Sequence, residues 1–261
     1  MRFVDIPGVP DFECYEFDVK NSDYCLLIPI LNEKGRIEVE LQRALKSGVD
    51  KLCDIIIIDG GSTDGSCETN LWELGVNTLL IKTGEGKQGA QLRCGFFYAE
   101  MRGYKGYITI DGNNKDSIES IPLFIDKLKD GYDFIQGSRY INGGKHTNTP
   151  FFRYLSVRLV HSPLISNAAK FKFTDTTNGF RGYSKAYIEN KEVKIYRDIF
   201  LGYELLAYLS VRAAQLGLKV IEVPVERNYP KGKTPTKISP LKGSYNLLQI
   251  LLNTIKGRYN P

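Results

Sequence analysis

Two aspartates each close a short apolar run and stand directly before a glycine. Asp59 follows the β-branched run 55–58, and Asp111 follows the run 107–110. In a parallel sheet, ligands bind outside the carboxyl ends of the strands, so both carboxylates would face the ligand crevice. An Asp-Gly pair is also a common turn former, and a turn or helix cap is the alternative for each. Two such aspartates on separate strand ends favour a binding role.

Asp111 opens a stretch rich in oxygen ligands, Asp-Gly-Asn-Asn-Lys-Asp, which ends at Asp116. Mg²⁺ takes one or two carboxylates from a protein, while substrate phosphates and water complete its coordination. We therefore expect a divalent metal (Mg or Mn) held by Asp111 and Asn113, with Asp116 as a spare ligand. An Asx-rich turn before a helix at Ser117 is the alternative.

The segment Gly84–Gly89 reads GxGxxG between a predicted strand and a predicted helix. This is the pattern of a dinucleotide-binding turn, so an NAD-dependent dehydrogenase is one alternative. The pattern normally follows the first strand, however, and two strand–helix units precede it here. It is not a P-loop, because Lys87 is followed by Gln88 rather than Ser or Thr.

Apolar periodicity predicts which elements position these residues. The predicted strands are 25–30, 54–58, 77–81, 107–110 and 133–136, and the helices between them are 33–47, 64–74, 89–101 and 117–129. The second half of the chain gives helices at 151–169 and 201–216, a strand at 219–225 and an apolar tail at 241–255. Strand–helix alternation predicts an α/β fold, a mostly parallel sheet with helices on both faces.

Charge is distributed unevenly along the 261 residues. Residues 1–135 carry a net charge of −8, whereas residues 136–261 carry +13. The basic half indicates an anionic partner. A non-enzymatic nucleic-acid-binding protein would explain that charge, but it would not explain the aspartates at strand ends, and we expect no nucleic acid. The basic loop 229–237 could close over a pyrophosphate.

Several function classes receive no support from the sequence. The five cysteines form no CxxC pair, so neither a zinc ribbon nor a disulfide framework is indicated, and a reducing cytoplasm is expected. No apolar run approaches the ~20 residues of a membrane span, and no signal peptide is visible. The two histidines, His146 and His161, form no recognisable Ser/His/Asp set.

An ordered set of short motifs resembles family 2 glycosyltransferases of the GT-A fold, in particular the polyprenyl-phosphate (dolichyl-phosphate mannose synthase-like) branch. These motifs cover about residues 24–240 and are Ile28-Pro29 to Asn32-Glu33, Ile57-Ile58-Asp59 to Gly65, Gly89-Ala90 to Gly95, Ile110-Asp111 to Asn113, Gly137 to Tyr140, Gly179 to Arg181, Val223 to Arg227, and Pro235 to Lys237. Three positions depart from the family pattern: Gly60 and Asn113 replace aspartates, and Lys115 stands where the branch often has a metal-binding Gln.

The resemblance implies a single Rossmann-like GT-A domain and a set of roles. The expected donor-binding residues are Pro29, Asn32, Glu33, Asp59, Lys87, Gln91, Arg227 and Lys237, with the metal on Asp111 and Asn113. The expected acceptor-binding residues are Arg139, Arg153 and Arg181. Asp111, Arg139, Asp175 and Glu204 are the expected catalytic residues. A nucleotidyltransferase has a similar sheet and metal site, but it usually carries a Gly-rich basic loop where this chain has Leu31-Asn32-Glu33.

The expected reaction is inverting transfer of a sugar from a nucleotide diphosphate sugar to a polyprenyl phosphate or a glycan, in cell-surface polysaccharide or glycoconjugate synthesis. A phosphate acceptor needs no general base, whereas a sugar hydroxyl needs one. Asp175, Asp198 and Glu204 are candidates, with Asp175 first.

The expected organisation has four parts: an N-terminal extension (1–23), a nucleotide-sugar half (24–136), an acceptor half (137–240) and an amphipathic helical tail (241–261). The tail could lie on the cytoplasmic face of a membrane, or pack on the domain or in a dimer interface.

Overall fold

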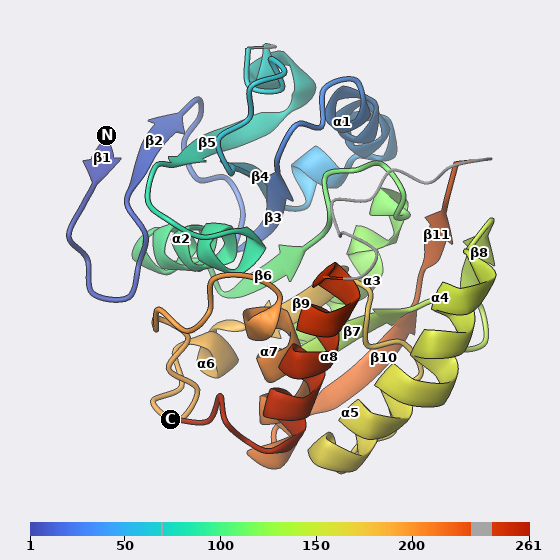
Figure 1. Cartoon of the computed structure of the whole chain (residues 1–261). Helices are drawn as coiled ribbons and strands as arrows, with labels where there is room; N and C mark the ends of the chain where they lie inside the picture. Colours follow the sequence, from blue (N-terminus) through green and yellow to red (C-terminus); the bar gives the residue numbers. More distant parts are fainter. Residues whose placement is uncertain (69, 231–241) are drawn as a thin grey trace.

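A computed structural model describes residues 1–68, 70–230 and 242–261 of the chain (Figure 1). The main sheet has nine strands in the order β1-β2-β5-β4-β3-β6-β9-β7-β10. Its strands are β1 (Arg2–Phe3), β2 (Phe12–Glu16), β3 (Tyr24–Ile30), β4 (Asp54–Asp59), β5 (Val76–Lys82), β6 (Gly106–Thr109), β7 (Phe134–Ser138), β9 (Arg181–Ser184) and β10 (Val220–Pro224). A small parallel pair joins β8 (Lys145–Thr147) to β11 (Glu226–Asn228).

Helices surround the sheet. They are α1 (Arg36–Ser47), α2 (Gln88–Met101), α3 (Ile121–Lys129), α4 (Phe151–Ser156), α5 (Ser162–Ala169), α6 (Lys185–Ile188), α7 (Glu204–Gln215) and α8 (Lys242–Ile255). Alternate residues of a strand face opposite sides. Ile56 and Ile58 of β4 pack into the core shared with α2 and α7, whereas Ile55 and Ile57 pack into the core shared with α1 and α3. The predicted α/β sheet covered on both faces is confirmed.

The centre of the sheet is parallel, as the buried apolar runs predicted. β5, β4, β3 and β6 run in one direction, so Asp59 and Asp111 lie toward the same edge. Gly112 is required at this edge, because a Cβ there would lie 2.5 Å from Cγ2 of Ile30. The N-terminal residues also join the sheet, since β2 pairs with β5 in the antiparallel direction.

Strand β9 lies antiparallel between β6 and β7, and the sequence did not predict it. Because its direction is reversed, the chain enters β9 at the edge where β6 and β7 end. The segment that precedes β9, residues 175–180, is therefore delivered to the same edge as Asp111.

The predicted helix 64–74 is mostly absent from the part of this range that the structure describes, residues 64–68 and 70–74. The segment contains turns and a short 3₁₀ helix, Leu71–Leu74. Ser66 donates its backbone N–H to the Asp64 carboxylate at 3.0 Å, and Gly65 has φ +82°. A side chain that bonds to nearby backbone and a left-handed glycine both end helical geometry.

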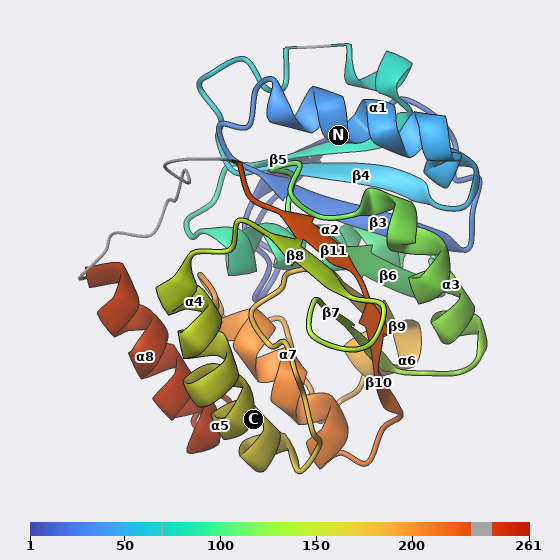
Figure 2. The same cartoon turned by 90° about the vertical axis from the view of Figure 1, so that its right-hand side faces the viewer.

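The predicted helix 151–169 forms as one continuous rod, with a π-helical turn over Val157–His161 between α4 and α5. Helix α8 packs against α5 and α7, and Leu251 is buried there (Figure 2). The predicted C-terminal helix is thus partly packed on the domain. Within the described ranges, every helix is too short or too polar to cross a bilayer.

Candidate active site

Asp111 follows β6 and is one-quarter exposed, so a ligand can reach its carboxylate. Its Oδ2 accepts a hydrogen bond from Arg227 Nη2 at 3.1 Å, and its Oδ1 accepts one from Gln88 Nε2 at 3.2 Å. A Cβ on Gly179 would lie 2.7 Å from Asp111 Oδ1, so this close approach requires glycine. The loop before β9 therefore packs directly onto the Asp111 carboxylate.

Arg227 links two acidic residues. Its second terminal nitrogen donates to Asp116, whose side chain is completely buried. Burial acts to lower the pKa of Arg227, but the carboxylates of Asp116 and Asp111 outweigh it and hold that pKa well above the ordinary value. Arg227 is therefore a permanent positive charge beside Asp111.

The oxygen atoms around Asp111 fit a divalent metal that also binds phosphate. Asn113 Oδ1 and Asp116 Oδ1 are both buried and have no hydrogen-bond partner in the described part of the chain. That same part contains no group of three or more His, Cys, Asp or Glu side chains able to hold a metal alone. Asp111 and Asn113 could supply two oxygen ligands, and phosphate and water would have to supply the rest.

A cluster of cations surrounds Tyr229, close to Asp111. The Tyr229 hydroxyl accepts hydrogen bonds from Arg153 Nη1 at 3.2 Å and from Arg139 Nη1 at 3.4 Å. Lys115 Nζ and Arg227 Cζ each lie 5.6 Å from the centre of its ring. Burial acts to raise the pKa of Tyr229, but Arg227, Arg139 and Arg153 outweigh it and lower that pKa. We call these four cations and Tyr229 the Tyr229 cluster.

Two members of the Tyr229 cluster carry their own counterions and two do not. Arg139 pairs with Asp175 through Nε to Oδ2 at 2.6 Å and Nη2 to Oδ1 at 2.8 Å, just as Arg227 pairs with Asp116. Arg153 and Lys115 form no ion pair with any residue that the structure describes. Their positive charges remain available to an anionic ligand.

The expected general bases are poorly placed. Asp175 is fully buried and bonded to Arg139 on both oxygens, so it cannot reach an acceptor hydroxyl; the geometry gives it the role of a counterion. Glu204 accepts a hydrogen bond from the backbone N–H of Gly202 at 2.5 Å, within the turn that starts α7. Asp198 is exposed and pairs with Arg93 at 3.0 Å.

Several residues expected at the donor pocket hold its loops in place instead. Asp59 accepts hydrogen bonds from the backbone of Gly61 and Ser62, which is the turn-forming alternative. Gln91 Nε2 donates to the carbonyls of Ile30 at 2.8 Å and Ile58 at 2.7 Å, so it ties β3 to β4. These bonds explain the residue types without a ligand.

The neighbouring loop at the end of β3 is also held in place by hydrogen bonds within the protein. Asn32 Oδ1 accepts from the Thr63 N–H at 2.8 Å, and the buried Glu33 carboxylate accepts from Arg36 Nε at 2.5 Å. Pro29 lies within β3 itself, beside Ile58 of β4. The loops after β3 and β4 are thus joined at the carboxyl ends of their strands.

The GxGxxG segment does not form a nucleotide turn of the dehydrogenase type. The backbone N–H of Lys87 donates to the Leu201 carbonyl at 2.7 Å, and a Cβ on Gly89 would lie 2.5 Å from the Gly202 carbonyl oxygen. Its glycines allow close packing of the chain before α7, and the Lys87 side chain is exposed. The useful residue here is Gln88, which the sequence analysis did not assign and which contacts Asp111.

Arg181 is not at the acceptor side. Its side chain is buried and donates to the backbone carbonyls of Asn178, Thr176 and Leu206, so all its nitrogens have partners in the protein core. Lys237 lies outside the described residues. Tyr229, the centre of the cation cluster, is a residue that the sequence analysis did not assign; its position two residues after Arg227 was the available signal.

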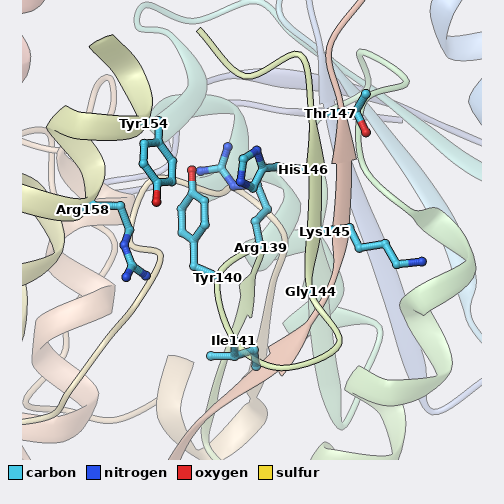
Figure 3. Close-up of a pocket in the computed structure, with 9 residues that line it drawn as sticks. All are labelled: Arg139, Tyr140, Ile141, Gly144, Lys145, His146, Thr147, Tyr154 and Arg158. Atoms are coloured by element: carbon cyan, nitrogen blue, oxygen red, sulfur yellow. The ribbon is translucent and has the colours of Figure 1, made fainter. Parts of the chain in front are cut away.

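A pocket of about 530 Å³ opens next to Arg139 (Figure 3). Its lining includes Tyr140, His146, Tyr154 and Arg158. The rings of Tyr140 and His146 are 5.3 Å apart, and both contact Tyr154. His161, in contrast, is largely buried against Thr176, with 2.6 Å between Nδ1 and Oγ1; burial lowers its pKa to about 4.

Comparisons with known proteins show what the chain resembles in sequence and in fold. The chain is 27% identical over 211 residues to the polyprenol monophosphomannose synthase of Mycolicibacterium smegmatis, covering 77% of this chain and 75% of that protein. It is also 27% identical over 203 residues to the undecaprenyl-phosphate mannosyltransferase of Micrococcus luteus, covering 76% of this chain and 81% of that protein.

The fold is similar to that of the glucosyl-3-phosphoglycerate synthase of Mycobacterium tuberculosis in complex with Mn²⁺, UDP and glucosyl-3-phosphoglycerate. The TM-score is 0.61 at 17% identity, covering 89% of this chain and 80% of the synthase. This likeness confirms the GT-A architecture. Residues 25–190 match the model of glycosyl transferase family 2. The chain therefore belongs to glycosyltransferase family 2 and is a glycosyltransferase, rather than a dehydrogenase, a nucleotidyltransferase or a non-enzymatic protein.

Proposed function

We propose that this glycosyltransferase moves a sugar, with inversion, from a nucleotide diphosphate sugar to a polyprenyl phosphate. The observation that carries the proposal is the position of Asp111 beside the Tyr229 cluster, which joins an accessible carboxylate to two uncompensated cations. Such a site suits two phosphorylated substrates. The names of the two mannosyl-transferring relatives support the choice of a polyprenyl phosphate.

The donor diphosphate would lie between Asp111 and Lys115. Asp111 and Asn113 would hold the metal, which would neutralise charge on the leaving diphosphate. Arg227 and Lys115 would add fixed positive charge at the same place, where negative charge develops as the glycosidic bond breaks. Asn32 and Glu33, in the loop after β3, would contact the nucleoside together with Pro29 near the end of that strand. Lys87 and Lys237 remain proposed donor contacts.

The acceptor phosphate would bind Arg153, with Arg139 and Tyr229 completing its surroundings. A phosphate is already an anion, so it attacks the anomeric carbon without a general base. The burial of Asp175 and the local bond of Glu204 support a phosphate acceptor over a glycan hydroxyl. In this proposal Arg139 is a catalytic residue, and Asp175 positions it.

We also propose contact with the cytoplasmic face of a membrane. Helices α4, α5 and α8 lie side by side and expose large apolar side chains (Figure 2). The exposed residues are Phe151, Phe152, Leu159, Val160 and Leu164 on the α4–α5 rod, and Tyr245, Leu248 and Leu252 on α8. An apolar face beside basic residues suits binding at a lipid interface, where a polyprenyl phosphate resides. The product would serve cell-surface polysaccharide or glycoconjugate synthesis.

A donor panel tests the proposal. UDP-, GDP-, CDP- and dTDP-sugars are screened by thermal shift with and without Mn²⁺, since a ligand that binds the folded state raises its apparent stability. The stabilising donor is then incubated with undecaprenyl phosphate or with a glycan, and the products are separated. Transfer to the lipid phosphate is expected. Transfer to the glycan alone would contradict the acceptor assignment, and the absence of any stabilising donor would contradict the whole proposal.

A further inference from the structure

The pocket beside Arg139 carries chemistry that the proposed transfer does not use. It is built from the end of β7, from β8 and from α4 with the π-helical turn (Figure 3). His146 faces Tyr140 and Tyr154, while its neighbours Lys145 and Thr147 point away, as alternation along a strand requires. The pocket lining therefore offers three rings and two arginines, and Ile141, Gly144, Lys145 and Thr147 also border it.

The two arginines are held against one ring. Arg139 Cζ lies 5.1 Å and Arg158 Cζ lies 5.4 Å from the centre of the Tyr140 ring. A guanidinium on an aromatic face keeps its N–H groups free in its own plane, where they can donate to an anion. The Tyr140 ring thus orients both guanidiniums. The nitrogens of Arg139 already donate to Asp175 and Tyr229, so the donors left for an anion are those of Arg158.

One of these arginines has no counterion. Asp175 neutralises Arg139, whereas Arg158 forms no ion pair with any residue in the described ranges. The Tyr140 hydroxyl is buried and also has no hydrogen-bond partner there. Buried polar groups in native proteins are generally satisfied, so the unpartnered Tyr140 hydroxyl, on the ring that carries the exposed guanidinium of Arg158, would suit an anionic ligand.

We propose that this pocket is a second phosphate subsite, distinct from the one at Arg153. Arg158 and the Tyr140 hydroxyl would donate to the anion, and the rings of Tyr154 and His146 would contact what is attached to it. Arg139 lies between the two subsites, since it reaches Tyr229 on one side and Tyr140 on the other.

The shared chemistry is a phosphate group on an apolar chain. It could come from the second phosphate of a polyprenyl diphosphate that binds in place of the monophosphate acceptor, or from the headgroup of a membrane lipid beside the acceptor. The assignment of the subsite to the acceptor side rests on the proposed function, but phosphate binding itself does not.

Direct binding tests the subsite without any donor. The full chain is titrated calorimetrically with farnesyl phosphate and farnesyl diphosphate, and its co-sedimentation with phosphatidylglycerol and phosphatidylcholine vesicles is measured. Arg158→Ala and Tyr140→Phe are compared with Arg2→Ala, which removes an exposed guanidinium from β1 at the opposite edge of the sheet. Arg158 is exposed, so Arg158→Ala should fold, and its melting temperature verifies this.

If the ligand is a polyprenyl diphosphate, Arg158→Ala should weaken farnesyl diphosphate binding at least tenfold, the scale of one charge-assisted hydrogen bond, and farnesyl phosphate binding by less than twofold. Tyr140→Phe should act in the same direction. For a lipid headgroup, Arg158→Ala should instead reduce selection of phosphatidylglycerol vesicles and spare both farnesyl ligands.

Two outcomes would overturn the subsite. Arg158→Ala could match Arg2→Ala on every probe, or it could weaken both farnesyl ligands equally, which would mean one phosphate site rather than two. Failure of the donor panel together with an Arg158 effect would overturn the transfer reaction and leave the phosphate subsite standing.

Discussion

Arg227 donates to the Asp111 carboxylate at 3.1 Å, so the residue expected to hold a metal already has an arginine on one of its oxygens. A metal at Asp111 would have to share that carboxylate with Arg227. Phosphate oxygens of the donor would then be needed to complete its coordination, because Asn113 offers a neutral amide. Metal and donor are therefore expected to bind together rather than in sequence.

Replacing Asp111 with alanine should reduce transfer at least a hundredfold, the effect of removing one group that stabilises transition-state charge. Product formation with the best donor is measured at saturating Mn²⁺. Asp130→Ala, at the exposed end of α3, is the matched control and should retain normal activity. Near-normal transfer by the Asp111 variant with any donor would show that the metal-site assignment is wrong.

Replacing Lys115 with glutamine should make the affinity for the donor depend more strongly on the metal. Without Lys115, the affinity for a nucleoside diphosphate in EDTA should fall about tenfold, because one charge-assisted contact is lost. Mn²⁺ should restore more of that affinity than it adds in the wild type, since a repelling charge near Asp111 is gone. Calorimetry with and without Mn²⁺ measures both effects, with Lys46→Gln on α1 as control. Unchanged binding in EDTA would remove Lys115 from the donor site.

The buried pair of Arg139 and Asp175 predicts a stability effect. Arg139→Met leaves a buried carboxylate without a partner and should lower the free energy of unfolding by about 3–5 kcal/mol. The double variant Arg139→Met/Asp175→Leu should recover most of that loss, although neither variant should transfer sugar. Urea denaturation measures the free energy of unfolding of both variants and of the wild type. A double variant as unstable as the single one would show that the uncompensated charge is not the cause.

The environment of His161 predicts that the free energy of unfolding falls at low pH. Its pKa in the folded protein is lowered to about 4 by burial, with a contribution from Arg181, whereas an unfolded histidine titrates near its ordinary value of about 6.5. The unfolded state therefore binds the proton first as the pH falls. The corresponding stability is complete above pH ~6.5 and is lost progressively down to pH ~4, by up to about 3 kcal/mol.

His161→Gln should lack this loss, so the difference in unfolding free energy between wild type and variant is the quantity to measure. The difference is needed because Glu100 acts in the opposite direction: burial raises its pKa to about 7, so its stabilisation is lost as the pH rises. Parallel curves for wild type and variant between pH 4 and 6.5 would contradict the assignment to His161.

The exposed aromatic pair on α4 predicts membrane binding. The variant Phe151→Ser/Phe152→Ser should reduce flotation with anionic vesicles several-fold, because two large apolar groups no longer enter the interface. Removing the tail from residue 241 is a poorer test, since Leu251 is part of the core. Trp72→Ser removes an exposed aromatic from the segment before β5 and serves as control. Equal flotation of all three proteins would eliminate the membrane surface.

The parallel core of the fold was predictable because its strands are continuous β-branched runs, as in Asp54–Asp59, which few other structures accommodate. Strand β9 was not predictable, because its four residues include Arg181 and Gly182 and gain their place from pairing with β6 and β7. Short strands of this kind follow from tertiary contacts rather than from local preference.

The site around Asp111 was also predictable only in part. Asp111, Arg139, Arg153 and Arg227 come together near Tyr229, as the motif order indicated. The partners of individual side chains did not follow from the motifs. Asp175 lies 36 residues from Arg139, and Gln91 contacts two strand ends, so their bonds depend on the packed fold. A motif locates a residue at the crevice, but only the hydrogen-bond partners separate ligand contacts from loop supports.

The π-helical turn over Val157–His161 holds one residue more than an α-helical turn. Because the wide turn absorbs the extra residue, the helix on either side keeps its register: Ile165 and Ala169 face the core while Tyr154 and Arg158 line the pocket. A one-residue deletion within α4 or α5 would rotate one end of the rod relative to the other by about 100° and break that register. A one-residue deletion inside the π-helical turn should instead be absorbed by a return to regular α-helix. This turn is therefore a place where the rod can change its length by one residue without turning its two ends apart.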